Sequence, residues 1–204
     1  MGDAFGTVGD KATKAGEKMM PVTAGITALG AAGVAASMEL DNGYDTIITK
    51  TGATGEALES LTTVADNVFS DMPTTMDDVG VAVGEVNTRF GATGTELENL
   101  SKEFIKFANI NGTDLNTAID SVDSIMTKFG VDASQTKNVL GLMTKAGQDT
   151  GISMETLETA LTTNGASLKE MGLDLTSSVN LLAQMEARGV DVSTALAGMK
   201  KAVQ

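Results

Sequence analysis

Three pairs of acidic residues are the side chains of this sequence best suited to chemistry. They are Asp77 with Asp78, Asp120 with Asp123, and Glu155 with Glu158. Two carboxyl groups that flank a glycosidic bond can hydrolyse it, one as a general acid and the other as a base or nucleophile. The acid must keep its proton near neutral pH, which requires a pKa raised by apolar surroundings. No pair lies in an apolar run, and Asp77, Asp78 and Glu155 fall in predicted first helical turns, where acids complement the helix dipole. We therefore interpret these residues as solvated or helix-capping acids.

Two absences argue against an enzyme more strongly than the acidic pairs argue for one. The 204 residues include no Cys and no His. The chain therefore has no thiol nucleophile, no disulfide and no thiolate metal site, and it lacks the commonest general base. We predict no enzymatic activity, no cofactor and no metal ligands. The formal net charge of −13 also disfavours binding to nucleic acid or to anionic membrane surfaces.

Two short motifs resemble ligand or modification sites, and we assign neither a function. Asp41, Gly43 and Asp45 resemble the start of a calcium-binding loop, but its twelfth position is Gly52 where a bidentate Glu is needed. The segment 111–113, Asn-Gly-Thr, has the form of a glycosylation sequon. Its composition predicts a turn followed by a helix N-cap.

Methionine is unusually frequent, with 12 residues against 3% aromatic residues and no Trp. Flexible methionine side chains could line an adaptable binding groove, but their helical spacing favours a role in filling the core. The methionines considered are those at positions 19, 20, 38, 126, 143, 154, 171, 185 and 199.

Two nearly identical segments indicate an internal repeat. GATGEALESL begins at Gly52 and GATGTELENL begins at Gly91. Each predicts a helix stop at a left-handed glycine, followed by a new helix with a threonine N-cap, Thr54 or Thr93. In the second copy, Glu96 lies three residues after Thr93, so a reciprocal capping box is expected. No Lys accompanies the glycines, which excludes a phosphate-binding loop of the Walker type.

The rest of the chain continues this pattern and predicts an all-α fold. Apolar residues recur at helical spacing, and no strand pattern of comparable strength is present. Stop glycines followed by an apolar residue recur at 130, 151, 172 and 189. Between them we expect roughly eight short antiparallel helices in tandem, as in a helical repeat or bundle. The predicted N-caps are Thr54, Thr75, Thr93, Thr113, Ser134, Ser153, Thr176 and Ser193.

The N-terminal part differs from the tandem region. We expect a frayed helix or fragment start over residues 1–20, an apolar Ala/Gly-rich helix within 21–51, and the tandem-helix region over 52–204. The long apolar helix is expected from about Val22 to Lys50, with Gly43 as a point where it could break.

The uncharged run 19–38 has two interpretations. Its twenty residues match the length of a membrane span, and its small residues would let helices approach closely. Ala and Gly add little transfer free energy, however, so we favour packing within a soluble protein or an oligomer. Membrane insertion remains the alternative.

The segment EVNTRFGATGTELENLSKEFIKFANINGTDLNTAIDSV, residues 85–122, resembles the core region of phage tail tape measure proteins. The upstream PVTAGITALGAAGVAASMEL and TGATGEALESL resemble the entry into that core, and the resemblance covers about residue 21 to the end. It lies in caps and apolar stripes and includes no catalytic signature. Members of that family are usually much longer, with extended helical regions inside the tail tube, so this chain resembles a fragment or truncated form.

The resemblance implies a structural role: determining tail length, assisting assembly and leaving the tube during genome delivery. It implies a place in the lumen of the tail tube, after a stage in the host cytoplasm. The implied partners are copies of the chain, tail tube and tail tip proteins, assembly chaperones and the host inner membrane through residues 19–38. The alternative function is a soluble helical-repeat module that binds a partner protein.

Overall fold

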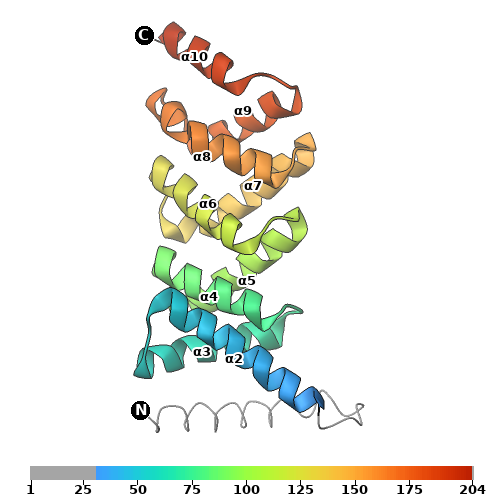
Figure 1. Cartoon of the computed structure of the whole chain (residues 1–204). Helices are drawn as coiled ribbons and strands as arrows, with labels where there is room; N and C mark the ends of the chain where they lie inside the picture. Colours follow the sequence, from blue (N-terminus) through green and yellow to red (C-terminus); the bar gives the residue numbers. More distant parts are fainter. Residues whose placement is uncertain (1–30, 204) are drawn as a thin grey trace.

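The computed structural model describes residues 31–203, and over this range it is all α-helical, without a strand. Nine α-helices and one short 3-10 helix follow one another with brief connections (Figure 1). Eight of the α-helices follow Gly52, as predicted. The α-helices are α2 (Ala31–Thr51), α3 (Gly55–Asp71), α4 (Met76–Phe90), α5 (Gly94–Asn111), α6 (Leu115–Phe129), α7 (Thr136–Thr150), α8 (Met154–Glu170), α9 (Leu175–Ala187) and α10 (Val192–Val203), and the 3-10 helix η1 spans Ala133–Gln135.

The helices form two layers that extend in one direction (Figure 1). Helices α2, α4, α6, α8 and α10 stack on one another in the first layer, which we call the even layer. Helices α3, α5, α7 and α9 stack in the second, the odd layer. The main packing contacts of each helix are with helices one or two places away along the chain. This is the nearest-neighbour architecture of helical-repeat proteins.

The structural repeat has the period of the sequence repeat. Gly52, Gly91 and Gly130 follow at intervals of 39 residues, and each adopts a left-handed conformation with φ of 65° or 66°. A residue with a Cβ would be strained there, so glycine ends the helix at low cost. After Gly130, the amide of Val131 donates to the carbonyl of Met126 at 2.9 Å, which completes the predicted Schellman closure.

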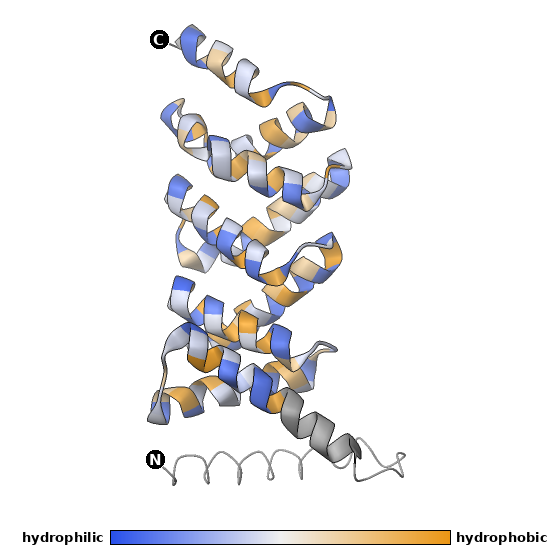
Figure 2. Ribbon diagram, viewed as in Figure 1, coloured by the Kyte–Doolittle hydropathy of each residue, from blue (hydrophilic) through white to orange (hydrophobic). Residues whose placement is uncertain are grey.

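The core is a seam of aliphatic side chains between the two layers. Phe104 on α5 is fully buried, and its ring centroid lies 5.4 Å from that of Phe90 on α4. Each helix carries both hydrophobic and hydrophilic stretches, as expected where one face is buried and the other is solvated (Figure 2). Met126, Met143 and Met154 are buried in this seam, in agreement with the core-filling interpretation.

Half of the predicted helix starts are correct. Thr54, Thr75, Thr93 and Ser153 are N-caps, but α6, η1 and α9 are capped by aspartates, and an aspartate also accepts an amide hydrogen at the start of α10. These carboxylates accept from amides two or three residues further on, at 2.7–2.9 Å, and so satisfy donors that the helix leaves free. The N-cap was wrongly predicted at four positions. The capping residue is Asp114 and not Thr113, Asp132 and not Ser134, Asp174 and not Thr176, and Asp191 and not Ser193.

The predicted capping box at Thr93 is wrong. Thr54 and Thr93 have the extended backbone of an N-cap, but neither side chain makes a capping hydrogen bond. A reciprocal pair forms instead at the start of α4. There the Thr75 hydroxyl accepts from the amide of Asp78 at 3.1 Å and donates to its carboxylate at 2.9 Å.

Helix α2 runs through Gly43 without the break that we considered. The Asn42-Gly43 pair is helical because this glycine lies where α2 crosses α4. A Cβ at Gly43 would come within 2.5 Å of the carbonyl oxygen of Met76. Close approach of two helices, and not a turn, therefore explains this glycine.

The remaining N-terminal predictions concern residues outside the described range. They are the frayed segment 1–20, the first part of the helix predicted within 21–51 and most of the uncharged run 19–38. Within residues 31–203, no helix is both long enough and apolar enough to cross a membrane.

Candidate functional site

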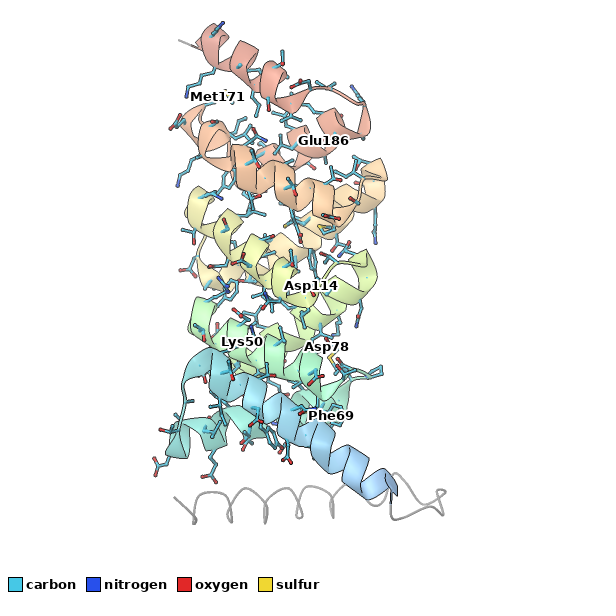
Figure 3. The ribbon with its side chains drawn as sticks, viewed as in Figure 1. Lys50, Phe69, Asp78, Asp114, Met171 and Glu186 are labelled. Atoms are coloured by element: carbon cyan, nitrogen blue, oxygen red, sulfur yellow. The ribbon has the colours of Figure 1, made fainter. Side chains whose placement is uncertain are left out.

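The first two acidic pairs have structural roles. Asp77 and Asp78 lie in the first turn of α4, where Asp78 exchanges hydrogen bonds with Thr75. Helices α4 and α6 run in the same direction, so Asp78 and the N-cap Asp114 lie at the same edge of the array (Figure 3). Carboxylates at helix N-termini are stabilised by the free amides there, which explains the lowered pKa of Asp114.

Asp120 and Asp123 on α6 pair with Arg89 on α4. The guanidinium Nη1 lies 2.9 Å from Asp120 Oδ1 and 3.7 Å from Asp123 Oδ2. Arg89 Nε also donates to Glu85 at 2.7 Å, and Glu85 in turn accepts from Lys50 on α2 at 2.5 Å. The guanidinium of Arg89 thus holds both acids of this pair, and their role in the structure is to link α6 to α4.

Glu85 is the centre of this network, which joins three successive helices of the even layer. Burial alone would raise the pKa of its carboxyl, but hydrogen bonds from Lys50 and Arg89 hold the pKa below its ordinary value. Lys50 also donates to Asn116 on α6 at 3.0 Å (Figure 3). The network therefore fixes the stacking of α2, α4 and α6.

Similar ion pairs join other helices of the same layer. In the odd layer, Lys102 on α5 lies 2.5 Å from Asp71 on α3, and Lys137 on α7 lies 3.1 Å from Glu103 on α5. At the far end of the even layer, Lys200 on α10 lies 2.9 Å from Glu170 on α8. At least one partner of each pair is exposed to solvent, so each pair contributes little to stability but favours one register of stacking.

The two acids of the third pair, Glu155 and Glu158, lie in different environments. Glu155 is exposed in the first turn of α8, as predicted. Glu158 is only 3% exposed, and its Oε1 has no hydrogen-bond partner. Burial, and then repulsion by Glu155, raises the pKa of Glu158 to about 7. Our interpretation of Glu158 as a solvated acid is therefore wrong.

The reason for the error lies in the repeat. At the 39-residue spacing, Glu158 on α8 corresponds to Ile119 on α6 and Gly80 on α4, both of which are buried. Gly80 faces the preceding helix of the even layer, because its Cβ would lie 2.5 Å from the carbonyl oxygen of Gly43. Aligning the repeats over the whole chain would have shown that Glu158 occupies a packing position.

A second acid with a raised pKa lies near the start of the array. Tyr44 on α2 donates from its hydroxyl to Asp66 Oδ1 on α3 at 2.5 Å, and both residues are partly buried. Burial raises the pKa of Asp66, although the hydrogen bond from Tyr44 opposes the shift. The pair connects the two layers, and it could not be predicted from local patterns because 22 residues separate its members.

Two shallow grooves mark the even layer. One lies along α2 beside Lys50 and Asp77. The other lies between α8 and the connection from α9 to α10, and its charged residues are Glu155, Glu186 and Asp191. Neither groove is lined by Glu158.

The two motifs that resembled ligand or modification sites lie on regular structure. Asp41 and Asp45 belong to the continuous helix α2, which cannot form a calcium loop. Asn111 ends α5, and its side-chain amide donates to the carbonyl of Phe107 at 2.8 Å and to the Thr144 hydroxyl at 3.1 Å. Within the described range, no three acidic side chains are grouped so that they could hold a metal ion.

Comparison with known proteins assigns the chain to a family. Residues 65–204 match the family described as phage-related minor tail protein. The match covers more than half of the chain, and the chain belongs to this family. No curated protein and no solved structure matches it. Membership indicates a structural role in a phage tail, and therefore a component of the virion. It confirms the phage-tail part of the resemblance seen in the sequence.

Proposed function

We propose that the chain is the core region of a tape measure protein, which sets the length of a phage tail. Two observations support this proposal: membership of the minor tail protein family over residues 65–204, and packing of each helix mainly against its near neighbours. In an array of this kind, each helix pair adds a similar increment of length and depends little on distant pairs. A ruler requires this property, because its length must be proportional to the number of units.

The proposal includes the location and the partners. The chain occupies the lumen of the tail tube in the virion and the host cytoplasm before assembly. It contacts copies of itself, tail tube and tail tip proteins and assembly chaperones. At infection it leaves the tube ahead of the genome, and residues 19–38 engage the host inner membrane. The net charge of −13 is consistent with protein partners and disfavours binding to the genome itself.

Analysis of purified particles tests this location. We expect the chain in intact virions and its loss from particles that have been triggered to eject their genome. A tail tube protein measured in the same samples is the control, since it stays with the emptied particle. Absence of the chain from intact virions, or its full retention after ejection, would contradict the proposal.

A second candidate function is a protein-binding module. The groove between α8 and the α9–α10 connection favours it, because its charged residues are the acids Glu155, Glu186 and Asp191. A basic segment of a partner protein would suit this surface. Phage that lack the gene distinguish the two functions. Failure to form tails of the normal length supports a tape measure, whereas normal tails would support the binding module.

A further inference from the structure

We call the contact between two successive helices of the even layer a joint. The joint between α6 and α8 differs from the others in how it is held together. Ion pairs join α2 to α4 through Lys50 and Glu85, and α4 to α6 through Arg89 and Asp120. Another joins α8 to α10 through Lys200 and Glu170. Between the described side chains of α6 and α8 there is no ion pair and no hydrogen bond. Apolar packing alone holds this joint.

Glu158 lies at the same joint. It occupies the repeat position that faces the preceding helix, where α4 has Gly80 and α6 has Ile119. The side chain is 3% exposed, and its Oε1 has no partner. An ionised carboxylate in such a place loses its hydration without gaining hydrogen bonds or a counter-charge.

No neighbouring charge compensates Glu158. The charged side chains on the four helices that pack against α8 are Asp120, Asp123, Lys128, Lys137, Lys145, Asp149, Glu186, Lys200 and Lys201. None of them contributes to the shift in its pKa, which comes from burial and from Glu155 on the same helix. Lys128, the one base on α6, donates to Ser124 at 2.8 Å.

We propose that the α6–α8 joint is a pH-sensitive opening point of the array, closed while Glu158 is protonated and opened when its carboxyl ionises. The odd layer supplies the hinge. There α5 and α7 stay connected through Glu103 with Lys137 and through Asn111 with Thr144. Opening of the even layer alone bends the array at this point without dividing it. This inference does not depend on the proposed role in the tail.

The direction of the pH effect follows from proton linkage. In the open joint, water hydrates Glu158, and its pKa returns to the ordinary 4.5 from about 7 in the closed joint. The closed state is therefore fully favoured below pH 4.5, and this advantage is lost as the pH rises through 7. Between pH 5.5 and pH 8.5 the opening equilibrium should increase on the order of 30-fold.

Hydrogen exchange of the full chain at several pH values tests the opening point. Protection factors, which correct for the intrinsic effect of pH on exchange, should fall on the order of 30-fold in α6 and α8 between pH 5.5 and pH 8.5. Those of α5 should change far less. In Glu158→Gln the side chain keeps its shape but cannot ionise, so the pH dependence in α6 and α8 should disappear.

Two further variants make the test decisive. Glu158→Leu also removes the charge and should behave as Glu158→Gln does, so the test stands even if the amide variant fails to fold. The matched control is Glu155→Gln on the exposed face of α8, which should keep the transition and move its midpoint to lower pH. The proposal is wrong if wild-type protection in α6 and α8 does not depend on pH, if all helices lose protection together, or if a folded Glu158 variant keeps the wild-type pH dependence.

Discussion

The crossing of α2 and α4 predicts a strong effect for the substitution Gly80→Ala. A Cβ at Gly80 would lie 2.5 Å from the carbonyl oxygen of Gly43 and 3.0 Å from its Cα. Ordinary contacts begin at 3.4 Å, and both atoms belong to the backbone of α2, which cannot turn aside like a side chain. The two helices would therefore have to separate by about 1 Å at their crossing, where the core is closely packed.

The expected cost combines two opposing effects. Overpacking of a core typically costs about 1–3 kcal/mol. Replacing a mid-helix glycine by alanine returns about 0.5–1 kcal/mol through backbone entropy. The separation of α2 from α4 also loosens the contacts around Ile47 and Met76, both fully buried. We expect Gly80→Ala to lower the free energy of unfolding by about 1–2 kcal/mol.

Urea denaturation followed by circular dichroism measures this change. The matched control is Gly141→Ala, in the middle of α7, because a Cβ there meets no atom within 4 Å. This control has the entropic gain without the clash, so it should raise stability by about 0.5–1 kcal/mol. The midpoint should thus move in opposite directions for the two variants. Equal stabilisation by both would refute the close approach of α2 and α4.

Four other predictions use the same reasoning. Phe104→Ala should lower the free energy of unfolding by about 3–5 kcal/mol, since the ring is fully buried, and a change below about 0.5 kcal/mol would place the ring at the surface. Glu158→Leu should stabilise the chain by about 3 kcal/mol more at pH 8 than at pH 4.5, because it removes a buried charge that exists only at the higher pH. Urea denaturation at the two pH values measures the difference, and an equal effect at both would show that Glu158 is solvated. Purified protein should not hydrolyse peptidoglycan in a reducing-sugar assay, and turnover abolished by Asp120→Asn or Glu155→Gln would contradict the structural roles of these acids. If residues 19–38 enter bilayers, Leu29→Asp should weaken liposome flotation, with a cost of about 2.5–3.5 kcal/mol for insertion; flotation of neither protein would exclude the membrane role, and equal flotation of both would indicate binding elsewhere in the chain.

The helical repeat could be predicted from sequence because its signals are local. Gly91 ends a helix through its own left-handed conformation, and Val131 closes the turn that follows Gly130 through one hydrogen bond to Met126. Neither feature depends on distant parts of the chain. The predicted N-caps failed where an aspartate stood two residues before the predicted Ser or Thr, as at Asp174, or one residue after it, as at Asp114. The carboxylate competes successfully for the free amides at those positions.

The remaining features depend on which helix faces which. Gly43 has the local signature of a turn, yet it serves the crossing of two helices that are far apart in sequence. The local sequence does not distinguish Glu158 from the other acidic residues, and only its place between α6 and α8 makes it buried and unpaired. The pairing of Lys50 on α2 with Glu85 on α4 likewise depends on the stacking order of the even layer. Tertiary packing, not local preference, decides these cases.

Tail length measured in phage with altered numbers of repeats tests the tape measure proposal most directly. Deleting residues 91–129 joins Phe90 to Gly130, so the left-handed glycine after α4 is retained. Duplicating the same 39 residues one, two or three times gives a series, and replacing them with a copy of residues 52–90 is a control of unchanged length. Electron microscopy should show tails that shorten with the deletion and lengthen with each duplication, while the control keeps the wild-type length. The slope per unit is about 10 Å if the array stays stacked and about 60 Å if the unit extends into a continuous helix. Tails of constant length across the series would contradict the account.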